Sequence, residues 1–247
     1  MARPTVLLFD IDGTLVTTGG VGRRAFDRAF QRQHGRPDAC SHLRFDGMTD
    51  RGTTRLALEA IGVTPDDEAI DALLHLYLGE LKAELLLCTP DTYRVHVGVP
   101  EALAAASQRG GMALGLGTGN LKEGARLKLE HVGLYQHFGF GGFGSDHELR
   151  VELIRVGAER GARQLGLPLS ACRVVVIGDT PKDVDAARGI GAESLGVGTA
   201  SFTVQQLLEH GATYAFDDLL APEPSPRCWA TERYSIVPCK SAPATVK

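Results

Sequence analysis

The sequence of 247 residues is poor in cysteine, in long apolar runs and in any excess of positive charge. Its five cysteines are scattered and show no Cys-x-x-Cys spacing, which argues against structural zinc and against a disulfide framework. No apolar stretch approaches the roughly 20 residues of a membrane-spanning helix, and the first residues lack the pattern of a signal peptide. We therefore expect a cytoplasmic protein that does not associate with membranes.

The charge balance is slightly acidic. The chain has 26 Lys and Arg residues against 30 Asp and Glu residues, which gives a formal net charge of −4. This balance does not support binding to nucleic acid or to an anionic membrane, because both need clustered positive charge. The sequence leaves the oligomeric state open.

Strand and helix patterns alternate along most of the chain, which is typical of a parallel sheet with crossover helices. Short apolar runs predict five strands, at residues 5–9, 112–117, 173–177, 193–197 and 214–216. Amphipathic stretches predict helices at residues 100–108, 121–131, 151–165, 183–190 and 203–210. The predicted fold class is α/β, with a Rossmann-like parallel sheet and helices on both of its faces.

Residues 17–94 interrupt this alternation. They contain three helix-like stretches, at residues 22–34, 49–61 and 66–87, and no convincing strand. An insert of this length is more typical of a subdomain than of a loop. We therefore predict an α/β catalytic core of residues 1–16 and 95–221, with a helical cap of residues 17–94. Residues 222–247 contain five prolines and lose apolar periodicity, which indicates a mobile or peripheral tail.

Two carboxylates follow the first predicted strand at once, in the run Asp10-Ile-Asp12-Gly-Thr. The carboxyl ends of strands are where open α/β sheets bind ligands. Two acids at that edge repel each other and lose hydration, so they need a cation between them or a proton on one of them. Both conditions suit Mg²⁺-assisted phosphoryl transfer to an aspartate. The alternative interpretation is a polar turn after a buried strand.

A glycine-rich loop follows the second predicted strand and contains Thr118, Gly119 and Asn120. A hydroxyl and free N–H groups where a strand meets a helix can bind phosphate, although a loop with an N-capping Thr or Asn would look the same. The loop lacks the Gly-x-Gly-x-x-Gly spacing and the Gly-Lys-Ser/Thr ending, so neither nucleotide-binding fold is indicated.

Two further signals lie later in the chain. Arg150 stands near a helix start, where a fixed cation could offset an aspartate beside a phosphate; Lys122 and Lys128 are alternatives, and a solvated surface arginine is the simpler interpretation. Asp179 and Asp183 follow the strand at residues 173–177. Oxygen ligands of this kind suit Mg²⁺ better than a transition metal. Asp179 as an N-cap before a proline is a compatible alternative.

In this order the four signals resemble the motifs of the haloacid dehalogenase superfamily of hydrolases, in particular the phosphoglycolate-phosphatase-like group with a helical cap. The matching residues are Asp10-Ile-Asp12-Gly-Thr, Thr118-Gly-Asn120, Arg150 and Gly178-Asp179-Thr-Pro-x-Asp183. The resemblance covers roughly residues 4–221. It implies a Mg²⁺-dependent phosphatase that hydrolyses a small phosphorylated metabolite through an aspartyl-phosphate.

The resemblance also implies a role for each acid. Asp10 would attack phosphorus, while Asp12 would protonate the leaving oxygen and then activate water. Mg²⁺ would bind the Asp10 carboxylate, the Asp12 main-chain carbonyl and Asp179, with Asp183 as a ligand or as its support. Dehalogenases that resemble this fold generally lack an acid at the position of Asp12, so its presence favours a phosphate ester.

The remaining matched residues would handle the phosphate. Thr118, the N–H of Gly119 and the adjoining Asn120 would bind its oxygens. Arg150 would take the position where most members carry a lysine, which keeps the charge but replaces a compact ammonium with a planar fork.

Within the insert, residues 45–51 are the best candidate for a loop that faces the substrate. Arg51 or Arg55 could grip an anionic substrate, although solvated charges at an ordinary helix start explain the pattern equally well. Residues 19–22 resemble a hinge between core and cap.

Two other functions stay open. A phosphosugar mutase of the same superfamily would carry the same motifs but would have to shield its phospho-enzyme from water. A non-catalytic relative that binds phosphate or metal is also open, because fold alone would permit it; the intact Asp10 and Asp12 argue against it. Nothing in the sequence selects a particular phosphorylated substrate.

Overall fold

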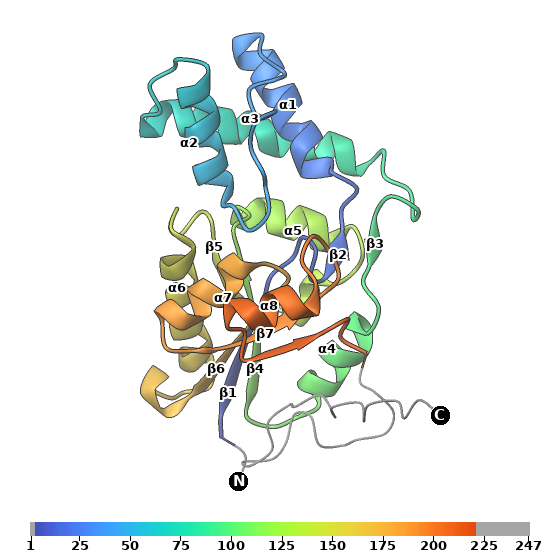
Figure 1. The fold of residues 1–247 in the computed structure, drawn as a ribbon, viewed down its shortest axis with the longest axis vertical. Coiled ribbons are helices and arrows are strands. Elements are labelled where there is room, and N and C mark those ends of the chain that lie inside the picture. The colour runs from blue at the N-terminus through green and yellow to red at the C-terminus, as the bar shows by residue number, and fades with distance from the viewer. Residues whose placement is uncertain (1–2, 221–247) are drawn as a thin grey trace, which may run out of the picture.

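A six-stranded parallel sheet forms the centre of the computed structural model, which describes residues 3–220 (Figure 1). Its strands lie in the order β5-β4-β1-β6-β7-β8, and every neighbouring pair is parallel. Their bounds are β1 Thr5–Phe9, β4 Met112–Thr118, β5 Phe140–Phe143, β6 Arg173–Gly178, β7 Glu193–Val197 and β8 Tyr214–Phe216. The predicted α/β fold class is confirmed.

Helices cover both faces of this sheet. They are α4 (Val99–Ser107), α5 (Lys122–Glu130), α6 (Arg150–Gln164), α7 (Pro181–Gly189) and α8 (Val204–His210). Strand β1 is buried on both sides, as expected at the centre of a parallel sheet. Its Leu7 and Phe9 share a core cluster with residues of α4 and α5, whereas Val6 and Leu8 share another with α6 and α7.

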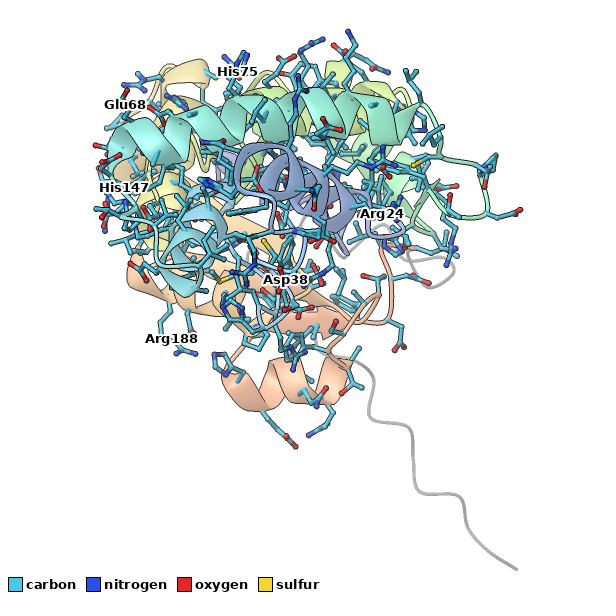
Figure 2. The ribbon with its side chains drawn as sticks, turned by 90° about the horizontal axis from the view of Figure 1, so that it is seen from above. Arg24, Asp38, Glu68, His75, His147 and Arg188 are labelled. Atoms are coloured by element: carbon cyan, nitrogen blue, oxygen red, sulfur yellow. The ribbon has the colours of Figure 1, made fainter. Side chains whose placement is uncertain are left out.

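Three further helices occupy the chain between β1 and β4: α1 (Val21–His34), α2 (Asp50–Ala60) and α3 (Asp67–Leu85). They lie together beyond the carboxyl ends of the strands (Figure 1). Seen from above, α3 runs beside α1 across this end of the molecule (Figure 2). The predicted helices of this segment are therefore present, and they stand over the edge of the sheet where ligands bind. Its role as a cap stays a prediction at this point.

The two links to this helical layer pair with each other. Strand β2 (Val16–Thr17) runs antiparallel to β3 (Arg94–Val95), a short ribbon that the sequence did not predict. A pair of two-residue strands is too short to give a recognisable alternation of apolar and polar residues. The ribbon lies where the chain leaves the sheet region and where it returns.

Strand β5 was also missed by the sequence prediction. It consists of Phe140, Gly141, Gly142 and Phe143, and it lies at one edge of the sheet. Two adjacent glycines lower the strand propensity of the segment and hide its apolar pattern.

Three further predictions concern the C-terminal tail, the cysteines and the cellular location. The predicted tail, residues 222–247, falls outside the described residues. Cys40, Cys88 and Cys172 are free thiols. Within residues 3–220, no helix combines the length and the apolarity that a membrane crossing requires. The cytoplasmic location stays a prediction.

Candidate active site

Three loops meet at the carboxyl edge of the sheet, directly after β1, β4 and β6. Together with the helices beyond them they border a pocket of about 600 Å³, a size typical of sites for small molecules. The structure brings seven of the ten predicted site residues to this pocket: Asp10, Asp12, Thr118, Gly119, Asn120, Arg150 and Asp179.

A cluster of three carboxylates lies at the floor of the pocket. Oxygen atoms of Asp10, Asp179 and Asp183 lie within 4.8 Å of one another, and all three residues are buried. Burial raises the pKa of Asp10 to about 6, against the opposing charge of Arg150. Burial, with the charges of Asp183 and Asp10, holds the pKa of Asp179 well above its usual range. Three crowded carboxylates, of which Asp10 and Asp179 resist ionisation, form a site that fits a hard divalent cation such as Mg²⁺.

Gly13 and Thr14, which follow Asp12 in the sequence, hold Asp179 in this cluster. The Thr14 hydroxyl donates a hydrogen bond of 2.9 Å to Asp179 Oδ1. Gly13 has a φ of +84°, and a Cβ atom there would lie 2.4 Å from Asp179 Oδ2. Glycine is therefore required both by the backbone conformation and by the close approach of the carboxylate. The Gly-Thr that follows Asp12 in the sequence thus serves an acid from a different strand.

The start of α7 corrects one interpretation of the sequence. The N-cap is Thr180, and Asp183 Oδ2 accepts hydrogen bonds from its N–H (3.1 Å) and hydroxyl (2.7 Å). Asp179 as the N-cap was therefore wrong. Because Thr180 and Asp183 satisfy the helix start between them, the Asp179 carboxylate stays free to face the cluster.

Arg150 bridges the acids of the cluster from the first turn of α6. Its Nη2 lies 2.8 Å from Asp10 Oδ2, and its Nε donates to Asp183 Oδ1 at 3.0 Å. The arginine side chain is only 8% exposed. Of the two alternatives named for this role, Lys122 is exposed and Lys128 lies at a different acid. Arg150 is thus the cation that faces Asp10.

Asp12 has a different environment from Asp10. Lys128 Nζ lies 2.8 Å from both of its carboxylate oxygens, and Asn120 Nδ2 donates to Oδ2 at 2.7 Å. Burial would raise the pKa of Asp12, but the charge of Lys128 and the hydrogen bonds from Lys128 and Asn120 outweigh it and hold the pKa below its usual range. The Asp12 side chain is 38% exposed, on the pocket side.

The loop after β4 supports this second acid. Asn120 Nδ2 also donates to Thr118 Oγ1 at 2.8 Å, and its Oδ1 accepts from Lys128 Nζ at 2.7 Å. Both ends of the Asn120 side chain are therefore occupied by protein groups. A Cβ atom at Gly119 would lie 2.1 Å from the carbonyl oxygen of Met48, so glycine here lets the helical layer approach the loop closely.

The sequence analysis did not single out several residues that line the pocket, and it underrated one of them, Lys128. Lys128 was named only as an alternative to Arg150. Its signal was a lysine seven residues after Leu121 and three after Ala125, a spacing that puts it on the buried and otherwise apolar face of α5. Asp50 and Tyr77 come from the helical layer and line the pocket. Asp50 belongs to the loop of residues 45–51 that the sequence suggested as facing the substrate, whereas no pattern in the sequence distinguished Tyr77 from an ordinary helix residue.

Asp50 ties the helical layer to the loop after β4. Its N–H donates to Gly119 O, and its Oδ2 accepts from the N–H of Leu121, both at 2.8 Å. Burial raises the pKa of Asp50 to about 6, against the charge of Lys128 and the Leu121 hydrogen bond.

The two arginines predicted to grip a substrate do not line the pocket. Arg51 pairs with Asp67 at 2.8 Å and also with Asp71. Arg55 pairs with Glu148, with Nε 2.9 Å from Oε1. Arg51 is thus paired with acids of α3 and Arg55 with an acid that precedes α6, so the structure does not bring either arginine to the site.

A carboxylate cluster beside a pocket, at the carboxyl edge of a parallel sheet, places the molecule in the class of α/β proteins that bind their ligand at that edge. Within this class the chain belongs to the haloacid dehalogenase-like hydrolases, whose family model matches residues 4–191. The resemblance inferred from the four motifs is thereby confirmed. No curated protein sequence matches the chain significantly.

Several solved structures share the fold. A hydrolase from Pseudomonas syringae is 19% identical, with a TM-score of 0.65 over 88% of this chain and 94% of its own. CbbY from Rhodobacter sphaeroides, in complex with phosphate, is 18% identical, with a TM-score of 0.66 over 88% of this chain and 95% of its own. β-Phosphoglucomutase from Clostridium difficile is 16% identical, with a TM-score of 0.63 over 89% of this chain and 92% of its own. At these identities the likeness shows the fold alone.

Proposed function

We propose that the protein is a Mg²⁺-dependent phosphatase that hydrolyses a small phosphorylated metabolite through an aspartyl-phosphate at Asp10. The observation that carries this proposal is the placement of two acids of one loop in opposite environments. Asp10 lies in the carboxylate cluster beside Arg150, while Asp12 lies next to Lys128 and opens to the pocket.

The first half-reaction would be carried by Asp10. Its carboxylate oxygen forms a bond to phosphorus as the bond to the leaving oxygen breaks, and Asp12 donates its proton to the leaving oxygen. Arg150 keeps the Asp10 carboxylate oriented and balances its charge. Mg²⁺ held by Asp10, Asp179, Asp183 and the main-chain carbonyl of Asp12 would neutralise charge that builds up on the phosphate oxygens.

The second half-reaction would depend on Asp12. A water molecule attacks the phosphorus of the aspartyl-phosphate, and Asp12 takes its proton, which regenerates the Asp10 carboxylate and releases phosphate. The lowered pKa of Asp12 supports this base role because the carboxylate is ionised at neutral pH. Protonation of the leaving oxygen in the first step requires Asp12 to hold a proton, which the charge of Lys128 opposes in the free enzyme.

Residues 17–94 are proposed to cap this site. The hydrogen bonds of Asp50 to the loop after β4, and the close approach of Met48 to Gly119, hold the helical layer against the pocket. Such a layer excludes water from the reacting atoms and contacts the organic part of the substrate.

The test is phosphate release from a panel of phosphorylated metabolites, with Mg²⁺ and with a chelator. We expect release that depends on Mg²⁺ and is lost in Asp10→Asn. Release of no phosphate from any member, or full activity of Asp10→Asn, contradicts the proposal. Since β-phosphoglucomutase shares the fold, the panel includes sugar phosphates. Isomerisation without net release of phosphate would identify a mutase instead.

A further inference from the structure

One cation of the pocket differs from the others in its partners. Three cationic side chains line the pocket: Arg23, Lys128 and Arg150. Lys128 is neutralised by Asp12, and Arg150 by Asp10 and Asp183. Arg23, in the first turn of α1, has no carboxylate within 4.0 Å anywhere in residues 3–220.

The other arginines of α1 show that this is not a general property of the helix. Arg24 (labelled in Figure 2) and Arg28 both pair with Glu84, at 2.6 and 2.7 Å. Arg32 pairs with Glu80 at 3.4 Å. The side chains that point away from the pocket thus find acids, and the one that lines the pocket does not.

Arg23 is nevertheless held in place. Its Nη1 donates to the carbonyl oxygen of Cys40 at 2.9 Å, its Nη2 donates to that of Leu43 at 2.6 Å, and its guanidinium carbon lies 4.1 Å from the centre of the Phe45 ring. These two bonds use two of the five N–H donors of a guanidinium. The side chain is therefore ordered before any ligand arrives, which lowers the entropy lost on binding.

The hydrogen bonds of Arg23 connect α1 to residues 40–43, but this structural role does not require a positively charged side chain. Two neutral carbonyl groups orient the fork but do not balance its positive charge. Asp27, one turn further along α1, lies beyond ion-pair distance, and burial raises its pKa even though Arg23 acts in the opposite direction. A fixed, unbalanced guanidinium beside a pocket favours an anion within that pocket.

Arg23 stands at the start of α1, which borders the part of the pocket where Asp12 lies and where the proposed reaction would put the leaving group. A Cβ atom at its neighbour Gly22 would lie 3.7 Å from both Lys128 Nζ and Tyr77 Oη. The start of α1 thus adjoins the cation that holds Asp12. The wall around Arg23 is aromatic, because Phe26 stacks on Tyr77 with ring centres 4.0 Å apart and meets Phe45 edge-on.

We infer that Arg23 binds a second anionic group, a carboxylate or a phosphate, carried by the organic part of the substrate. The substrates are then phosphomonoesters that bear a further negative charge at a distance from the reacting phosphate. This inference rests on the proposed phosphatase activity, because it assigns the leaving-group side of the pocket.

The test uses matched compounds that differ only in the second anion. Phosphorylated hydroxy acids of two to six carbons are compared with phosphorylated diols of the same length, and diol bisphosphates with the monophosphates. The first set probes a carboxylate and the second a phosphate. KM and kcat are measured for wild type, Arg23→Met, Arg23→Lys and the control Arg32→Met, whose arginine lies on the same helix outside the pocket.

At one length or more, we expect wild type to prefer the anionic member by about tenfold to a hundredfold in KM, as charge-assisted hydrogen bonds produce. Arg23→Met loses this preference while its KM for the neutral member stays close to wild type. Arg23→Lys regains part of it, and Arg32→Met keeps it. Equal KM values for both members at every length, or a loss in Arg23→Met that affects both members alike, overturns the inference and leaves the phosphatase proposal intact.

Binding measurements distinguish a failure of the proposed anion site from a failure of the proposed reaction. In the Asp10→Asn background, the dissociation constants of the same compounds are measured by calorimetry with and without Arg23→Met. If wild type hydrolyses nothing but Asp10→Asn binds the anionic members more tightly through Arg23, the proposed reaction fails and the anion site stands. If no member binds, both fail.

Discussion

Asp10 and Asp12 are two residues apart on one loop, yet they lie in opposite surroundings. Asp10 is buried with two other acids and one arginine, and its pKa is raised to about 6. Asp12 is surrounded by a lysine and an amide, opens to the pocket, and has a lowered pKa. Because the two side chains contact different partners, one loop supplies two carboxylates with different chemistry.

The comparison shows how a pair of identical side chains acquires separate roles. The carboxylate that resists ionisation stands where a divalent cation would favour its charged form. The carboxylate that ionises readily stands where a water or leaving group would exchange a proton with it. Arg150 pairs with Asp10, and Lys128 pairs with Asp12. Each cation can be replaced by mutation without changing the other.

The largest effect is expected for Asp10→Asn. If Asp10 is the nucleophile, the substitution removes the covalent route and lowers kcat by at least about a thousandfold. The measurement is phosphate release under saturating Mg²⁺, with the exposed Asp91→Asn as control. A loss of less than about tenfold contradicts the assignment of Asp10.

Lys128→Met is expected to rank second. Without the lysine, the Asp12 carboxylate loses its main partner, and proton transfer from water slows, with kcat lower by about a hundredfold or more. The slow step is then the second half-reaction, so a rapid-quench experiment should show a burst of leaving-group release that wild type lacks. The exposed Lys122→Met serves as control. Loss of the rate with no burst would place Lys128 in the first step instead.

Asp179→Asn tests the carboxylate cluster around Asp10 as the site of Mg²⁺ binding. Removal of one carboxylate from the cluster should weaken Mg²⁺ binding by about tenfold to a hundredfold, measured by the Mg²⁺ concentration for half-maximal activity. Saturating Mg²⁺ should restore part of kcat, whereas it should restore nothing in Asp10→Asn. An unchanged Mg²⁺ requirement would show that the cluster is not the metal site.

The smallest effect concerns Asp50, which shares Lys128 with Asp12 but has a raised pKa of about 6. The folded state holds its proton more tightly than the unfolded chain, where the pKa is 3.8. Its contribution to stability is therefore present below about pH 4 and is lost as the pH rises to about 6. Between about pH 4 and pH 8, wild type should lose at most about 3 kcal/mol relative to Asp50→Asn in chemical unfolding. Parallel stability curves would show that Lys128 balances Asp50 as well as Asp12.

The sheet was well predicted from the sequence because five of its six strands carry their own signal. Strands β1, β7 and β8 have the predicted bounds, and the eight helices of the structure end within two residues of the predicted positions. Acids at the ends of β1 and β6 were expected to meet, since parallel strands in one sheet share a carboxyl edge. Local patterns failed only where glycines or very short pairs conceal a strand, as in β5 and the β2–β3 ribbon.

The site was less predictable where it depends on packing between distant segments. Lys128 meets Asp12 across 116 positions of sequence, and its role follows from how α5 docks against the loop after β1. Arg51 and Arg55 were plausible substrate ligands by charge and position, but the orientation of α2 turns them toward Asp67 and Glu148. Arg23 was not singled out because its lack of an acidic partner is visible only in the structure.

The most direct test of the account is a crystal structure of the protein with Mg²⁺ and beryllofluoride, a phosphoryl mimic that needs no knowledge of the substrate. We expect the beryllium to be bound to a carboxylate oxygen of Asp10, with Mg²⁺ held by Asp10 and Asp179 and with Asp12 facing the mimic. Beryllofluoride bound elsewhere, or Mg²⁺ at a site without Asp10, would contradict the central claim that this aspartate receives the phosphoryl group.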